Sequence, residues 1–355
     1  MNTSLSIELL GARALGLPAA DIPAHAAGLR ARGGATVCVL DVPQPSGGSL
    51  HWLEAGHARG WVRLDAAAPG DLAERVRAVF PVATRRGFVA ADAALLALHE
   101  AHGGELPRLS WGDAPRFEPA GPVAGAKPMG LYALVDSAAR LAQVIEAGVH
   151  SVQVRIKTPR DADAAWQRGL HEELARCVAL AREAGVELIV NDHQALAAEL
   201  GAPGVHLGQE DLLALGDEGR AALLARGLTL GISSHSVWEL CRARALAPRY
   251  IACGPVWPTT TKDMPWVPQG LDNLAWWCGR AGAPVVAIGG ILEAPQVRAA
   301  AAAGADGVCI VRGLGEVPAR VVPALREAFE AGRAEAAAAT VPAWPHPSLP
   351  AGEGA

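Results

Sequence analysis

Cations recur at the end of one short apolar run, SVQVRIK (151–157). Gln153, Arg155 and Lys157 are two residues apart, so on an extended strand their side chains point to the same face. Two unpaired cations inside a closed sheet would carry a large desolvation penalty. Either this face is salt-bridged against a helix, or it binds an anion such as a phosphate, for which Arg offers a fork of donors and Lys a point charge. We favour the anion site.

Two carboxylates follow the next two apolar runs. Asp192 comes directly after ELIVN (187–191), and Asp211 lies two residues beyond GVHLGQ (204–209). Neighbouring strands are about 5 Å apart, so both carboxylates can reach one point. Carboxylates beside cations suited to a diphosphate predict a Mg²⁺ ion that holds phosphate oxygens. The alternative is that each Asp caps the N-terminus of the helix that follows it.

The last two apolar runs end in groups that suit a second phosphate. Gly289 and Gly290 follow PVVAI, while Val311 and Arg312 follow GVCI. In barrels of eight strand–helix units, the loops after strands 7 and 8 often bind phosphate through backbone N–H groups. The double Gly could also be only a tight turn. Two anion sites side by side indicate a transfer between two phosphorylated substrates.

Two histidines are more ambiguous. His206 lies inside the apolar run GVHLG and is better explained as an interior residue than as a catalyst. His235 follows the strand that ends at Ser233 and Ser234, and it could orient a ligand or cap a helix.

The elements that carry these residues form a repeat. From residue 130 onward, runs rich in Val, Ile and Leu alternate with Ala- and Leu-rich amphipathic segments. The eight runs are 131–136, 151–157, 187–192, 204–209, 228–234, 250–256, 284–290 and 307–313. Strands apolar on both faces are typical of a parallel sheet covered by helices, and eight units favour closure. The predicted fold is α/β: a (β/α)8 TIM barrel over residues 129–333 with an additional small N-terminal α/β domain.

The rest of the chain does not join this repeat. A predicted strand at 36–43 and helices at 71–80 and 92–104 indicate a small α/β domain of unknown role over residues 1–110. Residues 111–128, rich in Pro, Gly and Ala, are predicted to be a linker. Residues 334–355 lack an apolar period and are predicted to be a flexible tail.

Composition excludes several kinds of partner. The chain has a net charge of −5, with 51% hydrophobic and 19% charged residues. Such a balance argues against nucleic acid or a membrane surface as a partner. A signal peptide is not evident and no 18-residue apolar run occurs, so we expect a cytoplasmic protein that could form a homo-oligomer. The six cysteines are scattered without a C-x-x-C pair, which argues against disulfides and zinc.

Taken in order, several motifs resemble those of one enzyme family. LYALVD, QVRIK, ND, GVHLGQED, GISSHS, GPVWPTTTK, PVVAIGGI and GADGVCIV are similar to the motifs of thiamine phosphate synthase, also called thiamine-phosphate pyrophosphorylase, over about residues 129–318. The resemblance implies a transferase of thiamine biosynthesis. It would condense two small molecules, 4-amino-2-methyl-5-diphosphooxymethylpyrimidine and thiazole phosphate, into thiamine phosphate and diphosphate. The implied mechanism is dissociative and assisted by Mg²⁺.

The resemblance also implies a role for each motif residue. Arg155, Lys157, Lys262 and Ser233 would be catalytic. The pyrimidine diphosphate would be bound by Gln153, Arg155, Lys157, Asn191, Ser233 and Lys262. Asp192 and Asp211 would ligate Mg²⁺. The thiazole phosphate would lie against Thr259, Thr260, Thr261, Gly289, Gly290, Val311 and Arg312. Two positions depart from the family pattern: Ile156 stands where members often have an acidic residue, and Arg312 where several have Ser.

Two other classes of function stay open. The barrel could belong to a thiazole tautomerase or another phosphate-binding barrel enzyme, or it could sense a ligand without catalysis. The presence of QVRIK, both aspartates and TTTK favours the synthase.

Overall fold

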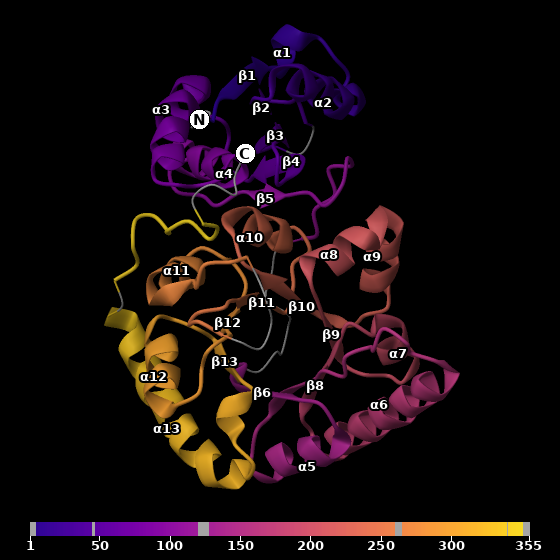
Figure 1. The fold of residues 1–355 in the computed structure, drawn as a ribbon. Coiled ribbons are helices and arrows are strands. Elements are labelled where there is room, and N and C mark those ends of the chain that lie inside the picture. Colours follow the sequence, from indigo (N-terminus) through magenta and orange to yellow (C-terminus); the bar gives the residue numbers. More distant parts are fainter. Residues whose placement is uncertain (1–4, 45–46, 120–127, 260–264, 339, 351–355) are drawn as a thin grey trace.

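The computed structural model describes residues 5–44, 47–119, 128–259, 265–338 and 340–350 of the chain. Its strands form two sheets, one of five strands and one that closes into a barrel of eight. Figure 1 shows the two parts one above the other, with helix α10 (Val237–Arg244) of the barrel between them. The predicted fold class, a (β/α)8 barrel with a small N-terminal α/β domain, is therefore confirmed.

The barrel strands are all parallel and pair in chain order until the last strand returns to the first. They are β6 (Gly130–Val135), β7 (Ser151–Val154), β8 (Glu187–Asn191), β9 (Gly204–Leu207), β10 (Thr229–Ser234), β11 (Tyr250–Cys253), β12 (Val285–Ala287) and β13 (Gly307–Ile310). Each predicted run overlaps one of these strands. The second run is shorter than predicted, because β7 stops at Val154 and leaves Arg155 and Lys157 in the loop beyond the strand end.

Helices form the outer layer of the barrel. They are α5 (Ala138–Glu146), α6 (Ala164–Ala184), α7 (Gln194–Glu199), α8 (Gln209–Ala214), α9 (Gly216–Ala225), α10, α11 (Gly270–Cys278), α12 (Ala294–Ala302) and α13 (Pro318–Glu335), with the short 3-10 turns η2 (Arg312–Leu314) and η3 (Ala336–Ala338). Side chains fix where several of them begin. Ser137 accepts from the N–H of Arg140 at the start of α5, and Asp163 accepts from the N–H of Trp166 at the start of α6.

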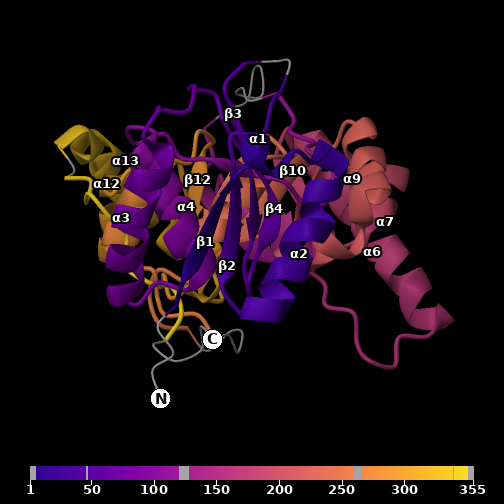
Figure 2. The ribbon, with the colours of Figure 1, turned by 90° about the horizontal axis from the view of Figure 1, so that it is seen from above.

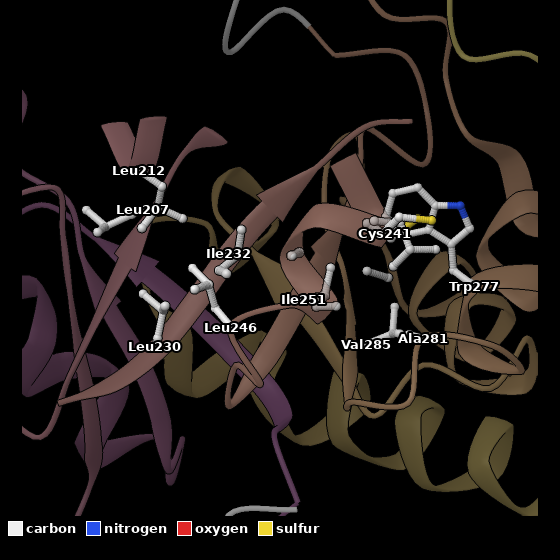
Figure 3. Close-up of a cluster of buried hydrophobic side chains, with 14 of the residues drawn as sticks. Leu207, Leu212, Leu230, Ile232, Cys241, Leu246, Ile251, Trp277, Ala281 and Val285 are labelled. Carbon is white, nitrogen blue, oxygen red and sulfur yellow. The ribbon is translucent and has the colours of Figure 1, made fainter. Parts of the chain in front are cut away.

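The barrel has an outer and an inner core. Outward-facing strand residues such as Leu230, Ile232 and Ile251 pack under α8, α10 and α11 (Figure 3). The inner core is a separate cluster of Met129, Tyr132, Ile189, Tyr250, Ala252, Val286 and Cys309. Since both faces of each strand are covered, the strands are apolar throughout, which is the pattern that the sequence shows.

The N-terminal domain is a five-stranded sheet with helices on both faces. Its strands lie in the order β1 (Ile7–Gly11), β2 (Thr36–Leu40), β3 (Ser49–Glu54), β4 (Arg59–Leu64), β5 (Arg108–Leu109), and only β1 and β2 are parallel. Its helices are α1 (Ala12–Leu15), η1 (Ala19–Asp21), α2 (Ile22–Gly33), α3 (Leu72–Arg85) and α4 (Ala90–Ala101). Alternate residues of β2 separate the two faces: Val37 and Val39 pack with α2, while Cys38 and Leu40 join the cluster of α3 and α4. Figure 2 shows α2 on the opposite side of the sheet from α3 and α4.

The two parts are joined by buried contacts. Helix α4 and strand β5 pack on α10, and Arg244 of α10 donates to the carbonyl of Pro107 at 2.7 Å. Of the predicted linker 111–128, residues 120–127 lie outside the described residues. Trp111 is buried, and the guanidinium groups of Arg220 and Arg242 lie 5.6 and 5.5 Å from its ring. The start of the predicted linker is therefore part of the interface.

The C-terminal segment differs from the predicted flexible tail. Residues 334 and 335 are the last two of α13, and residues 336–338 form η3. Residues 340–350 pack against both parts of the molecule. His346 Nε2 bonds the Gln269 carbonyl at 2.9 Å, and the Trp344 ring meets Phe88 of the N-terminal domain at 6.1 Å. These are individual long-range contacts, so the segment needs no apolar period to be held in place.

Two further sequence expectations concern the whole chain. All six cysteines lie in the described residues as free thiols, five of them buried. Within the part of the chain that the structure describes, no helix combines the length and apolarity needed to cross a membrane.

Candidate active site

A cavity of about 280 Å³ opens at the carboxyl ends of the barrel strands. It gathers most of the predicted site residues, which come from seven different strand ends. They are Gln153, Arg155, Asn191, Asp192, Asp211, Ser233, Thr259, Gly289, Gly290, Val311 and Arg312. Leu134, Ala252, Ile288 and Cys309 add apolar surface. A cavity with an apolar floor and polar groups converging at its mouth is the usual form of a small-molecule site.

Lys157 lines a neighbouring cavity of about 470 Å³. The two cavities share Leu134, Arg155, Val311 and Arg312 in their walls. Because β7 ends before Arg155, the alternating-face argument does not apply to Lys157. The structure keeps both cations at the mouth of the barrel, where water and anions can reach them, so an interior pair of unpaired charges does not arise.

The two predicted metal ligands act on each other electrostatically. Burial and the neighbouring Asp211 raise the pKa of Asp192, while Arg155 opposes the shift. One oxygen of Asp211 accepts from the Gly208 N–H at 3.1 Å, so the predicted capping alternative describes part of what Asp211 does. Asp192 is not the N-cap of α7, because that position belongs to His193. Its φ of +65° is a left-handed conformation that Asp and Asn adopt more readily than most residues.

These carboxylates suit a divalent cation that also binds a ligand. Across the described residues, no group of three or more His, Cys, Asp or Glu could hold a metal ion by itself. Two carboxylates that repel each other beside a cavity would instead share an ion with oxygens from a phosphate. The donor set therefore fits Mg²⁺ bound together with a diphosphate.

A chain of buried hydrogen bonds orients two of the polar residues. Gln153 Nε2 donates to the Tyr132 hydroxyl at 3.0 Å, and the hydroxyls of Tyr132 and Tyr250 are 2.7 Å apart. His206 joins the Tyr250 hydroxyl through Nδ1 and the Ser233 hydroxyl through Nε2, both at 2.8 Å. Gln153 and Ser233 thus reach the cavity from opposite ends of one network, and the network fixes both side chains.

Each cavity histidine is held by hydrogen bonds to neighbouring side chains. Burial and the positive charge of Arg155 lower the pKa of His206 to about 4, so its ring is neutral near pH 7. His206 is therefore an interior residue, as the sequence indicated. The His235 ring bonds Glu239 through Nδ1 at 2.9 Å and stacks on Trp266 with its centroid 5.2 Å away.

The double Gly is required by close packing as well as by its turn. Gly289 and Gly290 have φ of +93° and +71°. A Cβ on Gly289 would lie 2.6 Å from Cα of Pro255, and one on Gly290 would lie 2.6 Å from Cβ of Trp257. The tight-turn alternative is thus correct for the backbone. The same pair also lines the cavity, so the turn and a phosphate contact are compatible.

The loop after β11 is described only in part. Thr259 lines the cavity, whereas the predictions for Thr260, Thr261 and Lys262 fall outside the described residues.

Comparison with known proteins matches the barrel part of the chain, which carries the cavity. The profile of the family described as thiamine monophosphate synthase matches residues 131–314. The chain belongs to this family. The thiamine-phosphate synthase of Neisseria meningitidis serogroup A / serotype 4A is 43% identical over 206 residues, which cover 57% of this chain and 96% of that protein. The enzyme of the same name from Rhizobium etli is 43% identical over 181 residues, covering 51% of this chain and 84% of the relative.

A solved structure shares the description. The thiamine phosphate pyrophosphorylase of Pyrococcus furiosus is 26% identical with a TM-score of 0.48, and it covers 58% of this chain and 97% of that one. The recognition of the family from its motifs is confirmed by the profile and the relatives, and so is the prediction of an enzyme that makes thiamine phosphate. The matched region begins at residue 131, so the N-terminal domain lies outside it.

Sequence reasoning missed the residues that hold the site in place. Tyr132 and Tyr250 stood out in the sequence only as parts of apolar runs. The one local signal is Gly231, whose lack of a side chain makes room for the Tyr250 ring. A Cβ on Gly231 would lie 2.3 Å from Cζ of Tyr250. Glu239, which binds His235, lay in an amphipathic segment and gave no signal of its own.

Proposed function

We propose that the barrel joins the pyrimidine diphosphate to thiazole phosphate. Its cations and carboxylates would bind the pyrimidine diphosphate, and backbone groups on the other side of the cavity would bind the thiazole phosphate. The observation that carries the proposal is the single cavity that gathers residues from seven strand ends, with Arg155, Asp192 and Asp211 on one side and Gly289 and Gly290 on the other. Family membership supplies the two substrates.

The charged residues of the cavity would bind the leaving diphosphate and its metal ion. Arg155 and Lys157 would bind its oxygens as a fork and a point charge at the mouth of the barrel. Asp192 and Asp211 would hold Mg²⁺, which, when bound, neutralises charge that develops on the diphosphate. Burial and then the neighbouring Asp211 carboxylate raise the pKa of Asp192, and a divalent cation bound to both carboxylates would offset the repulsion between them.

The reaction needs no proton transfer. The C–O bond to diphosphate breaks with its electron pair on the oxygen, and the thiazole nitrogen then forms a C–N bond to the methylene carbon. His206 is hydrogen-bonded through both ring nitrogens, and the mechanism assigns a general-base role to neither cavity histidine. The chain's part is to stabilise the leaving charge and to hold the nucleophile close.

The remaining predicted contacts follow the same division. Gln153, Asn191 and Ser233 would hold the pyrimidine ring, and Lys262 the diphosphate. Thr259, Thr260, Thr261, Gly290 and the backbone at Val311 and Arg312 would hold the thiazole phosphate. Backbone N–H groups after strands such as β12 and β13, the last two of the barrel, often donate hydrogen bonds to phosphate in this fold.

The test is a coupling assay on the full chain with both substrates. Thiamine phosphate should form with Mg²⁺ and stop when EDTA removes the metal. Lys157→Met keeps the length of the side chain but not its charge, and should lower kcat/KM at least about 100-fold, as loss of a charge-stabilising contact does. Turnover of thiazole phosphate alone, without the pyrimidine diphosphate or metal, would instead favour a tautomerase.

A further inference from the structure

The N-terminal domain covers the outer side of one barrel helix. In a (β/α)8 barrel the helices form the surface layer, yet all seven residues of α10 from Val237 to Ala243 are buried. Helix α4 and strand β5 of the N-terminal domain pack there. The domain therefore meets the barrel directly behind β10, the strand that carries Ser233 into the cavity.

One carboxylate crosses this interface. Asp92 of α4 is 2% exposed, and its Oδ1 accepts from the backbone N–H of Trp238 at 2.8 Å. The first turn of α10 has a second acceptor of its own, since Ser236 Oγ accepts from the N–H of Glu239 at 3.3 Å. A barrel N–H group is thus satisfied by a residue 146 positions earlier in the chain.

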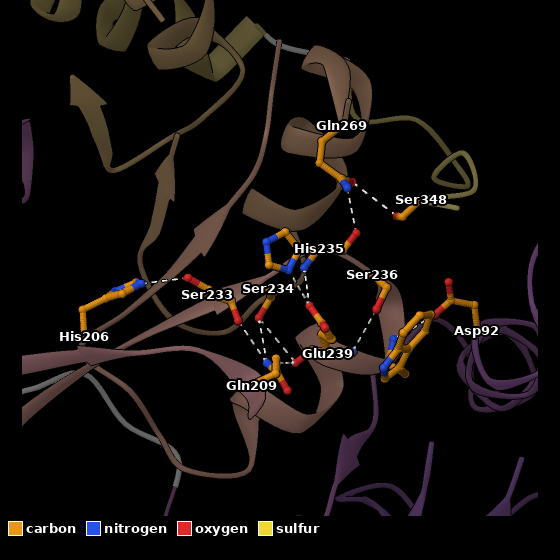
Figure 4. A network of polar contacts seen from close by, with 11 residues as sticks. Asp92, His206, Gln209, Ser233, Ser234, His235, Ser236, Glu239, Gln269 and Ser348 are labelled. Carbon is orange, nitrogen blue, oxygen red and sulfur yellow. Dashed lines mark hydrogen bonds and ion pairs between the residues drawn. The ribbon is translucent and has the colours of Figure 1, made fainter. Parts of the chain in front are cut away.

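The same turn of α10 holds the cavity wall. Glu239 Oε2 accepts from the backbone N–H of His235 at 2.6 Å and bonds its Nδ1 at 2.9 Å. Gln209 Nε2 donates to the carbonyls of Glu239 and Ser233 at 3.2 and 3.1 Å. Figure 4 shows this network running from His206 and Ser233 through Glu239 to Ser236, with Asp92 at its far end.

Aromatic packing follows the same path. The Trp238 ring lies 5.5 Å from that of Trp266, which in turn stacks on the His235 ring. Trp266 belongs to the loop between β11 and α11 that carries Thr259. The turn that Asp92 holds is therefore in contact with two loops of the site.

We propose that Asp92 is a positioning residue for the synthase: by accepting from the first turn of α10, it sets the place of Glu239 and hence of the Ser233–His235 turn. The proposal rests on the proposed function for the substrates it names. It gives the N-terminal domain a role in the barrel's chemistry, although Asp92 touches neither substrate.

The test compares Asp92→Ala with Asp92→Asn in the full chain. Alanine removes the acceptor, whereas the Asn amide oxygen can still accept from Trp238. Asn is a close mimic, because burial raises the pKa of Asp92 to about 8 and keeps much of the native side chain neutral at pH 7. Asp92→Ala should raise KM for the pyrimidine diphosphate about tenfold, because the Asp92 turn holds the Ser233–His235 turn through the hydrogen bonds of Glu239. KM for thiazole phosphate should change by no more than about twofold, because the Asp92 turn meets the Thr259 loop through the ring contact of Trp238 with Trp266. Asp92→Asn should restore both constants to within about twofold.

A matched control separates positioning from general loss of stability. Phe80 is buried in α3 of the same domain, away from α10, so Phe80→Leu should lower the melting temperature and leave both KM values unchanged. Equal rises in both KM values, or the same KM pattern from Phe80→Leu, would overturn the inference. If Asp92→Ala fails to fold, Glu239→Gln tests the same path, since it weakens the bonds to His235, and it must reproduce the rise in one KM only. A wild-type chain that forms no thiamine phosphate refutes the proposed function, whereas an active wild type with an unaltered Asp92→Ala variant refutes only this inference.

Discussion

Replacing Asp192 separates its chemistry from its backbone conformation. Asp192 has a φ of +65° and a pKa raised by burial and by Asp211. Asn tolerates the left-handed conformation and removes the charge, while Ala removes the charge and adds strain. Two variants at one position therefore give different predictions for stability and the same prediction for activity.

The expected sizes follow from those two effects. Asp192→Asn should be more stable than wild type in the absence of metal, by about 0.5–2 kcal/mol, as is common when a strained active-site group is removed. Asp192→Ala should be less stable than Asp192→Asn by about 1–2 kcal/mol, the penalty of a left-handed residue other than Gly, Asn or Asp. Both variants should lose at least about 100-fold in kcat, or about 2.7 kcal/mol of transition-state stabilisation.

Thermal unfolding and the coupling assay measure these effects together. Mg²⁺ and diphosphate at about 100 times their dissociation constant should stabilise the wild type by about 2.7 kcal/mol and leave both variants unchanged. Glu210→Gln is the control, because it removes an exposed carboxylate from the same cavity wall and should keep activity within about threefold. The reasoning is wrong if Asp192→Asn keeps a third or more of the activity, or if it is less stable than Asp192→Ala.

Three further predictions concern the frame around the site. Gly231→Ala places a Cβ 2.3 Å from Cζ of Tyr250 and should lower the free energy of unfolding by about 1–3 kcal/mol, whereas Gly169→Ala, with open space at its Cβ, should not; equal melting temperatures would contradict the packing. His346→Ala removes the bond to the carbonyl that precedes α11 and should raise KM for thiazole phosphate a few-fold by loosening the loop before it; an unchanged KM would mean that the loop holds itself. Burial raises the pKa of Asp92 to about 8, above the unfolded value of about 3.9, so its contribution to stability is present below pH 4 and is lost as pH rises to 8. Denaturant titrations from pH 4 to 9 should show that this decline is absent in Asp92→Asn, and parallel curves for the two proteins would exclude it.

The barrel and the position of the site at the carboxyl ends of its strands were predictable, because both follow the repeat of the sequence. Runs apolar on both faces require a covered sheet, and polar residues such as Asp192 and Asp211 come at regular places after them. The strand ends were harder to place. Nothing in SVQVRIK says that β7 stops at Val154, because the limit depends on how the neighbouring strands close the barrel.

The contacts that tie the parts together were not predictable. Asp92 lies in ADAALLALHEA, which is an ordinary helical sequence, and its partner Trp238 is set by docking of the two parts. His346 lies in a segment without periodicity and is held by hydrogen bonds to Gln269 and Asn273. Such bonds need particular partners far along the chain, and a local pattern carries no information about them.

The burial of α10 means that the barrel does not have a complete surface of its own. Its Trp238 N–H donates to Asp92, its Arg244 donates to the Pro107 carbonyl, and its Arg242 lies over the Trp111 ring. A chain cut before residue 129 would keep every strand of the barrel and still expose this helix to water. Recombinant barrels made in this way should aggregate unless the exposed side of α10 is redesigned with polar residues. For this chain, the boundary of the homologous region and the boundary of a soluble fragment are different places.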